Sequence, residues 1–299
     1  MSTAGPAFRC SQAGLDSGDD LAGSASTVRA FLLVEAEGAW GSQALDARLL
    51  PESVRATLRE MERRHNVRPL LIRRAGRRAG DDAPVTVFAA HAGPADPWVE
   101  RAQLDRFEDL LDIDTSGVRQ GRRPGLTPYT GPLFLVCTHG RHDACCAERG
   151  RPVWLAMRHA EPERTWQVSH IGGDRYAANV VVLPDGLYYG RVTPLDAPRL
   201  TEAHRNGRLL LERLRGRTAY PFAVQAAEIF LRRATGLLGD DDLVLVSQHR
   251  DGELTLAVFE AGPRRWRALV RSTADEPRQL TCSATRLNRP LRHELVSLT

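Results

Sequence analysis

Short apolar runs recur along the chain and predict buried strands. They are rich in β-branched and aromatic side chains and are followed by Gly, Pro, Asp or charged residues, a pattern typical of strands covered on both faces. The runs that we interpret in this way cover residues 30–35, 69–72, 85–89, 133–137 and 165–169, and a hairpin follows at 179–183 and 187–192. Strands of this kind separated by helical segments predict the α/β fold class.

Helical spacing of apolar positions appears between and after these strands. Residues 43–65 predict a helix that Pro51 should kink or interrupt, because proline lacks the N–H that a helix interior needs. The other predicted helices cover residues 104–111, 144–157, 198–214 and 220–238, and strands are predicted at 243–247, 253–259 and 265–270. We therefore expect the C-terminal region to be a helix plus a small antiparallel sheet, serving as structural cover or as a partner-docking module.

The length of 299 residues exceeds that of a usual single domain, and 42% hydrophobic residues suffice for a sizeable core. A stretch rich in Gly, Pro and Arg at 115–132 has no apolar period, so we place a domain seam there. The predicted parts are a loosely ordered lead-in (1–28), an N-terminal α/β domain (29–125), a second α/β domain (126–216) and a C-terminal α+β extension (217–299).

The charge pattern argues against nucleic acid as a partner. The net charge is +4, and all 41 basic residues are Arg, in pairs that alternate with acidic stretches. No apolar run approaches the ~20 residues of a membrane span. Five cysteines without a secretory leader indicate a reducing compartment rather than a disulfide framework. We expect a soluble, cytoplasmic protein with no membrane or nucleic-acid partner.

Metal-ligand residue types gather after two of the predicted strands. Cys137 ends the strand at 133–137, and Cys145 and Cys146 fall in the first turn of the next helix, where the helix dipole favours thiolate. The strand at 165–169 leads to His170 and, through a Gly-Gly turn, to Asp174. Two thiols, one imidazole and one carboxylate are a four-ligand set for iron or zinc.

These residues resemble a bacterial member of the sucrase/ferredoxin-like family. Eukaryotic relatives of that family hold a 2Fe-2S cluster through Cys-x8-Cys and His-x-Gly-Gly-His. The resemblance implies that Cys137, Cys146, His170 and Asp174 occupy the four ligand places, with Asp174 standing where the relatives have a second histidine. It also implies a thioredoxin-like fold for the ferredoxin domain at 126–216.

Alternatives for these residues stay open. Cys145 could compete with Cys146 as a ligand, or one of the pair could be a buried packing thiol. His139, His142 and Arg175 are candidates for the surroundings of the ligands, although each could equally be an ordinary loop or ion-pair residue. Asp143 is suited to cap the helix that begins at residue 144.

An internal echo relates the two halves of the chain. Residues 31–38 align with residues 133–140, keeping Leu, Val and Gly in register and setting Glu35 against Cys137. Two interpretations remain: a degenerate thioredoxin-like copy that lost its ligands, so that the chain has two tandem halves, or chance similarity between buried strands.

Three functions are compatible with the sequence. The leading hypothesis is one-electron transfer by a 2Fe-2S protein with an unidentified redox partner such as a reductase. The second is metal-free thiol chemistry on a thioredoxin-like scaffold, with Cys137 and Cys146 as the redox pair. The third is a non-catalytic scaffold that has lost its cluster. No Gly-x-Ser-x-Gly motif or readable carboxylate pair supports a sucrase activity.

Overall fold

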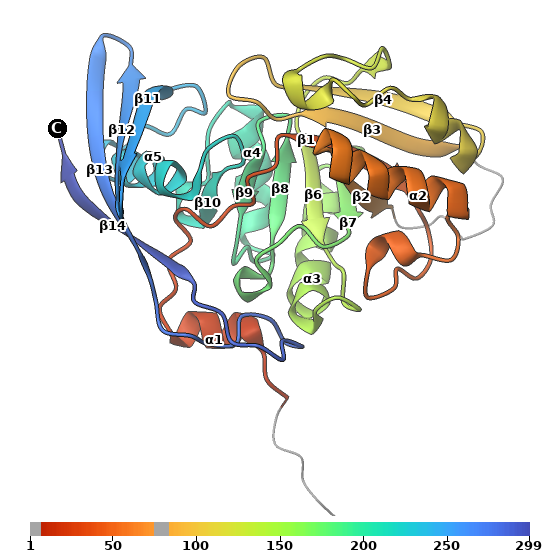
Figure 1. Cartoon of the computed structure of the whole chain (residues 1–299), viewed down its shortest axis with the longest axis horizontal. Helices are drawn as coiled ribbons and strands as arrows, with labels where there is room; N and C mark the ends of the chain where they lie inside the picture. The colour runs from red at the N-terminus through yellow and green to blue at the C-terminus, as the bar shows by residue number, and fades with distance from the viewer. Residues whose placement is uncertain (1–6, 75–83) are drawn as a thin grey trace, which may run out of the picture.

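A mixed β-sheet forms the centre of the computed structural model, which describes residues 7–74 and 84–299 (Figure 1). Within these residues ten strands form one sheet in the order β10-β9-β8-β6-β7-β2-β1-β3-β4-β5. The strands are β1 (Ala30–Glu35), β2 (Arg68–Arg73), β3 (Val85–His91), β4 (Trp98–Leu104), β5 (Thr127–Pro128), β6 (Leu133–Cys137), β7 (Thr165–Val168), β8 (Val180–Leu183), β9 (Leu187–Tyr189) and β10 (Leu214–Arg217). The α/β prediction is confirmed.

The two halves of this sheet share one topology. In the first half β1 is parallel to β2 and antiparallel to β3, which pairs with β4. In the second half β6 is parallel to β7 and antiparallel to β8, which pairs with β9. One helix makes the parallel crossover in each half, α2 (Glu52–Glu60) in the first and α3 (Ala144–Ala160) in the second. A βαβ unit followed by a hairpin is the thioredoxin-like arrangement, and the chain contains it twice.

The halves are joined edge to edge by their second strands. β2 and β7 pair antiparallel, with Ile72 opposite Val168. In the parallel pairs Glu35 lies opposite Ile72 and Cys137 lies opposite Val168. The two residues that the sequence echo aligned therefore stand at equivalent places, and the carboxyl ends of β1, β2, β6 and β7 meet at the centre of the sheet. Pairing also removes two exposed sheet edges.

The C-terminal region is a helix plus a small antiparallel sheet, as expected. α5 (Phe222–Thr235) packs against this second sheet, whose order is β11-β12-β13-β14 (Figure 1). Its strands are β11 (Val244–Asp251), β12 (Leu254–Ala261), β13 (Arg264–Ala274) and β14 (Leu291–Leu298). The sequence interpretation missed β14, whose side chains are mostly exposed and carry no clean apolar alternation.

Two predicted helices are shorter than expected. Pro51 does interrupt the segment at 43–65, leaving a short 3-10 turn at Ala44–Asp46, α2, and a π-helical turn at Met61–His65. The helix expected at 198–214 is α4 (Asp196–Arg205), which stops before Gly207 because that residue has a φ of 59°. The segment predicted as a helix at 104–111 is the end of β4 followed by a 3-10 helix at Phe107–Asp112.

The lead-in predicted as loosely ordered is ordered in its described part. α1 (Cys10–Asp16) packs against the 3-10 helix Asp174–Tyr176, and its Cys10 is buried. The prediction from composition was wrong for this part because Cys10 and a few apolar residues pack into a core that distant segments build. Residues 1–6 of that lead-in and the Arg/Gly/Asp turn at 75–83 lie outside the described residues.

The large sheet continues across the predicted seam. β5 follows that boundary in the sequence but pairs with β4 of the first half, through Glu100 and Pro128. The division of the chain into independently folding domains stays a prediction. Among the described residues, every helix is too short or too polar to cross a membrane.

Candidate metal centre

Cys137 lies at the end of β6, a strand with both faces buried. Its backbone N–H donates to the Asn179 carbonyl over 3.0 Å, and the neighbouring α3 approaches closely because residue 150 is glycine. A Cβ on Gly150 would overlap the Cys137 carbonyl oxygen. Strand register and helix packing together fix the Cys137 thiol at the mouth between β6 and α3.

The first turn of α3 sends its two cysteines in different directions. Asp143 caps the helix as predicted, accepting from the Cys145 backbone N–H over 2.9 Å. Cys146 turns toward Asp174, with its sulfur 3.2 Å from a carboxylate oxygen. Cys145 turns toward Cys282, and their sulfurs lie 3.4 Å apart. Of the two cysteines between which the sequence left the choice open, Cys146 lies beside the other candidate ligands and Cys145 lies in a different group.

The loop after β7 brings the other two candidate ligands to the same mouth. Gly172 and Gly173 have φ values of 97° and 81°, which only glycine adopts without strain. The guanidinium of Arg215 is fully buried behind this turn and donates to the Gly172 carbonyl over 3.0 Å. Within this support, the His170 Nδ1 forms an ion pair of 2.9 Å with Asp174.

The four predicted ligand residues are thus neighbours in the structure. Ligand atoms of Cys137, Cys146 and His170 all lie within 4.8 Å of one another, and Asp174 contacts both Cys146 and His170. The two cysteines are 1% exposed, so water has little access to their sulfurs. Soft thiols and an imidazole in a closed mouth are the donor set that iron or zinc prefers.

Two further histidines surround the centre. The His142 ring stacks on His170 with 3.7 Å between ring centroids, and its Nε2 is 3.8 Å from Asp174. His139 is buried and accepts from the His170 backbone N–H over 3.3 Å. The first half of the chain orients both rings, because the Gly41 carbonyl contacts His139 at 2.6 Å and the Ser42 carbonyl contacts His142 at 3.2 Å.

Charge is unevenly distributed among these groups. The pKa of Cys137 lies well below its ordinary value because Cys146 and His170 donate hydrogen bonds to it and stabilise its thiolate. The neighbouring Cys137 thiolate raises the pKa of Cys146 in turn. Burial alone would lower the pKa of His170, but its bonds to Asp174 and Cys137 raise it to about 9. Asp174 has a lowered pKa despite its burial, because His170 holds its charge.

Arg175 departs from the sequence interpretation. Its guanidinium leaves the centre, binding Asp19 over 3.0 Å and the hydroxyl of Tyr176 over 2.8 Å. The basic residue that sequence reasoning missed is Arg215, which supports the Gly172–Gly173 turn from β10. It lies more than 40 positions from the motif, and Arg213 and Arg217 stand two positions to either side of it, so the local sequence did not single it out.

The comparison with protein families matches residues 21–216, which include both halves of the large sheet. Over these residues the chain fits the family model described as Sucrase/ferredoxin-like. The chain belongs to this sucrase/ferredoxin-like family.

Similar curated proteins come from yeasts and carry the name Altered inheritance of mitochondria protein 32. The protein from Saccharomyces kudriavzevii is 29% identical over 144 residues, covering 40% of this chain and 46% of that protein. The protein from Saccharomyces cerevisiae S288c is 33% identical over 132 residues, covering 37% and 42%. The matched part of the chain thus spans less than half the length of these relatives. The expectation of a bacterial member is not borne out by them.

Two solved structures are also similar to part of the chain. Both are cysteine-to-serine variants of the thioredoxin-like 2Fe-2S ferredoxin from Aquifex aeolicus. They are 23% identical, cover 28% of this chain and 96% of the ferredoxin chain, and give TM-scores of 0.25 and 0.24.

Proposed function

We propose that this protein transfers single electrons through a 2Fe-2S cluster held by Cys137, Cys146, His170 and Asp174. The observation that carries the proposal is the convergence of two buried thiols and an imidazole within 4.8 Å at the mouth of a thioredoxin-like half. The spacing Cys-x8-Cys followed by His-x-Gly-Gly-Asp supports it, because it matches the family pattern at three of four places. A bound cluster would supply the one-electron redox couple.

The donor set suits such a cluster. The Cys137 thiolate is stabilised before any metal arrives, and His170 lies at the start of the loop that contains Gly172 and Gly173, with its ring beside both sulfurs. The fourth place has two candidates, since Asp174 and His142 both lie against His170. We assign it to Asp174, which is 2% exposed and contacts the Cys146 sulfur directly.

The remaining residues would protect the centre and give access to a partner. Cys137, Cys146 and Asp174 are buried, whereas His170 and His142 keep about a quarter of their side-chain surfaces exposed, at 24% and 27%. Both rings line a surface depression of about 470 Å³ together with His139 and the 3-10 turn Ala44–Asp46. We propose that a redox partner such as a reductase docks over this depression, in a reducing compartment that keeps the thiols free.

Anaerobic purification of the full chain tests this function. Iron and acid-labile sulfide per chain, visible absorption and electron paramagnetic resonance of the dithionite-reduced protein should report a 2Fe-2S cluster. Reduction by a reductase and reoxidation by an acceptor should then be measurable. A colourless, iron-free protein after reconstitution with iron and sulfide would refute the proposal and favour a scaffold without a cluster.

One observation favours a second candidate function. The lowered pKa of Cys137 and the raised pKa of Cys146 are the pairing of a nucleophilic and a resolving thiol in dithiol oxidoreductases. Their burial argues against large disulfide substrates, because reactive thiols are usually partly exposed. Alkylation of Cys137 no faster than that of free cysteine at neutral pH would eliminate this alternative.

A further inference from the structure

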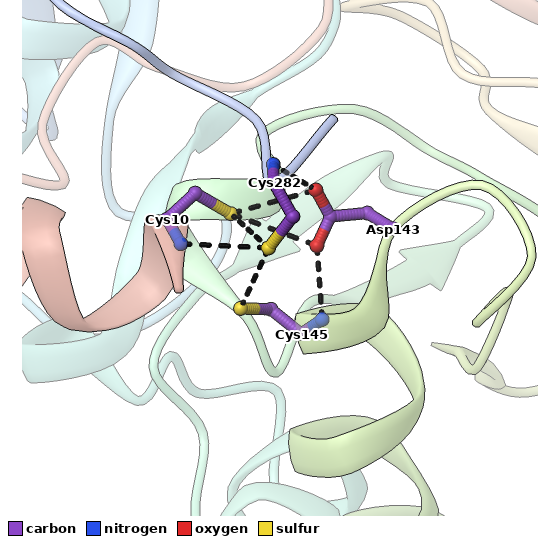
Figure 2. Close-up of side chains that lie close together, drawn as sticks. All are labelled: Cys10, Asp143, Cys145 and Cys282. Atoms are coloured by element: carbon purple, nitrogen blue, oxygen red, sulfur yellow. Dashed lines mark hydrogen bonds between the residues drawn. The ribbon is translucent and has the colours of Figure 1, made fainter. Parts of the chain in front are cut away.

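A second group of cysteines lies on the other side of the α3 N-terminus. Cys10 of α1, Cys145 of α3 and Cys282 of the β13–β14 loop converge on the carboxylate of Asp143 (Figure 2). Cys10 and Cys282 are separated by 272 positions in the sequence, and the family match at 21–216 includes neither of them. This group therefore has to be explained from the residues of this chain.

The distances within the group are those of ligands around one metal ion. The Cys282 sulfur lies 3.4 Å from the sulfur of Cys145 and 3.6 Å from that of Cys10. Both Asp143 oxygens lie 3.6 Å from the Cys10 sulfur. A tetrahedral zinc ion with Zn–S bonds of about 2.3 Å separates its sulfur ligands by roughly 3.8 Å. Ligand sulfurs bound to different irons of a cluster stand farther apart, so the spacing favours a single ion.

We propose that Cys10, Cys145, Cys282 and Asp143 form a structural zinc site, separate from the 2Fe-2S centre. Three thiolates and one carboxylate would complete a tetrahedral shell. The side chains of Cys10, Cys145 and Asp143 are almost fully buried and Cys282 is half-buried, which is the closed arrangement of structural rather than catalytic zinc.

Hydrogen bonds around the group suit thiolate ligands. The Ser11 hydroxyl donates to the Cys145 sulfur over 3.2 Å, and the Cys10 backbone N–H donates to the Cys282 sulfur over 3.5 Å. Asp143 is oriented by the N–H groups of Cys145 and Cys282, at 2.9 and 2.6 Å, and each of its oxygens retains a lone pair for a metal. The nearby Arg9 guanidinium is bonded to Glu148 over 2.7 Å.

Zinc at this place would join the two ends of the chain to the redox centre. The site would tie α1 and the β13–β14 loop to the first turn of α3 (Figure 2). Cys146 follows Cys145 directly in that turn. Closing so long a loop stabilises the folded state by restricting the unfolded chain, and the metal-binding energy adds to folding. The vicinal cysteines then have distinct roles, one for each site.

Metal analysis of full-length variants tests this site independently of the first. Anaerobically purified Cys137→Ser should lose iron and retain about one zinc per chain. Cys282→Ser should lose the zinc and retain the iron, whereas the neighbouring Ser283→Ala should keep both. Zinc content unchanged in Cys282→Ser would overturn the proposal, as would a Cys145–Cys282 disulfide in native protein, detected by mass spectrometry of unreduced peptides.

Cobalt serves as the spectroscopic probe, and alkylation covers a variant that fails to fold. Co²⁺ added to metal-depleted Cys137→Ser should give intense tetrahedral absorption and a thiolate charge-transfer band, and neither should appear in the double variant Cys10→Ser/Cys137→Ser, which lacks a cysteine of each site. In the wild-type chain, zinc should protect Cys10, Cys145 and Cys282 from iodoacetamide until a chelator is added. Equal alkylation with and without zinc would refute the site even if every variant unfolded.

Discussion

The two thioredoxin-like halves share a strand order but end their first strands differently. At the end of β1, Glu35 is buried and accepts a hydrogen bond from the Thr86 backbone N–H over 3.1 Å. At the equivalent end of β6, Cys137 faces Cys146 and His170. The first half thus uses the position to hold a neighbouring strand, and the second half places there a thiol that lies beside a second thiol and an imidazole. One fold supports both, because the scaffold specifies the place and the side chain specifies the use.

The same contrast appears after the second strands. By strand register, Arg74 after β2 corresponds to His170 after β7. The Arg74 guanidinium lies over the Trp166 ring, 4.0 Å from its centroid, and pairs with Glu163. The first half nevertheless contacts the candidate site. Its loop after β1 provides the carbonyl groups that contact His139 and His142, so the first half covers the candidate ligands of the second half.

Replacing Cys137 at the end of β6 should have the largest effect on iron content, and replacing Glu35 at the equivalent end of β1 is the matched control. Cys137→Ser should abolish the cluster, because a serine hydroxyl is a poor ligand for iron at neutral pH. Glu35→Gln keeps a hydrogen-bond acceptor for Thr86 and should retain iron and the visible spectrum. Iron per chain and absorption measure both. Equal iron content in the two variants would show that the second half does not hold the cluster.

Sequence reasoning predicted the features that depend on neighbouring residues and missed those that depend on residues far apart in the chain. Buried strands and the cap of Asp143 depend on neighbouring residues, so their patterns were readable, and eight aligned residues sufficed to suggest the repeat. The group of Cys10, Asp143, Cys145 and Cys282 escaped notice because Cys10 and Cys282 come together only when segments from opposite ends of the sequence have folded onto α3. The buried Arg215 escaped for the same reason, since its partners are loops more than 30 positions away.

Gly150→Ala, which fills the close contact between α3 and β6, should have the next largest effect, this time on the free energy of unfolding. A methyl group at position 150 would overlap the Cys137 carbonyl oxygen, so Gly150→Ala must shift α3 away from the strand. Overpacking of this kind costs about 3 kcal/mol of unfolding free energy. Urea denaturation should show this loss together with weaker cluster retention.

A matched control variant tests whether the loss of stability in Gly150→Ala comes from the contact with Cys137. Arg149→Ala changes the exposed neighbour and should stay within about 0.5 kcal/mol of the wild type. In the first half, Val54 and Leu58 of α2 fill the corresponding space between helix and sheet. If Gly150→Ala were as stable as Arg149→Ala, α3 could accept a methyl group at position 150 and the predicted overlap with the Cys137 carbonyl oxygen would be wrong.

The halves should also differ in acid sensitivity through His204 of α4. Burial, together with the charge of Arg217, lowers the pKa of His204 to about 4. The unfolded chain, with an ordinary histidine pKa near 6.5, binds more protons between pH 6.5 and 4, so stability falls as the pH falls through this window. At pH 5 the loss attributable to His204 is about 2 kcal/mol relative to pH 7.5.

His204→Gln should remove most of that pH dependence while leaving an acceptor for the Tyr189 hydroxyl, now 2.8 Å from the His204 ring nitrogen. Denaturation at pH 7.5 and 5 measures the difference. His91 of the first half also has a lowered pKa from burial, so His91→Gln is the matching variant there. An unchanged pH dependence in His204→Gln would contradict the assignment to the second half.

The smallest expected effect concerns the fourth ligand, where the second half departs from the family pattern. Asp174→His replaces an anionic ligand by a neutral one, which favours the reduced cluster because less negative charge surrounds the added electron. The reduction potential should rise by about 60 mV or more, the value of a tenfold change in a one-electron equilibrium. His142→Ala should change the potential less if Asp174 is the ligand, since the ring then stacks on His170 and approaches Asp174 only to 3.8 Å. Redox titration followed by electron paramagnetic resonance distinguishes the two residues, and a larger shift in His142→Ala than in Asp174→His would transfer the fourth place to His142.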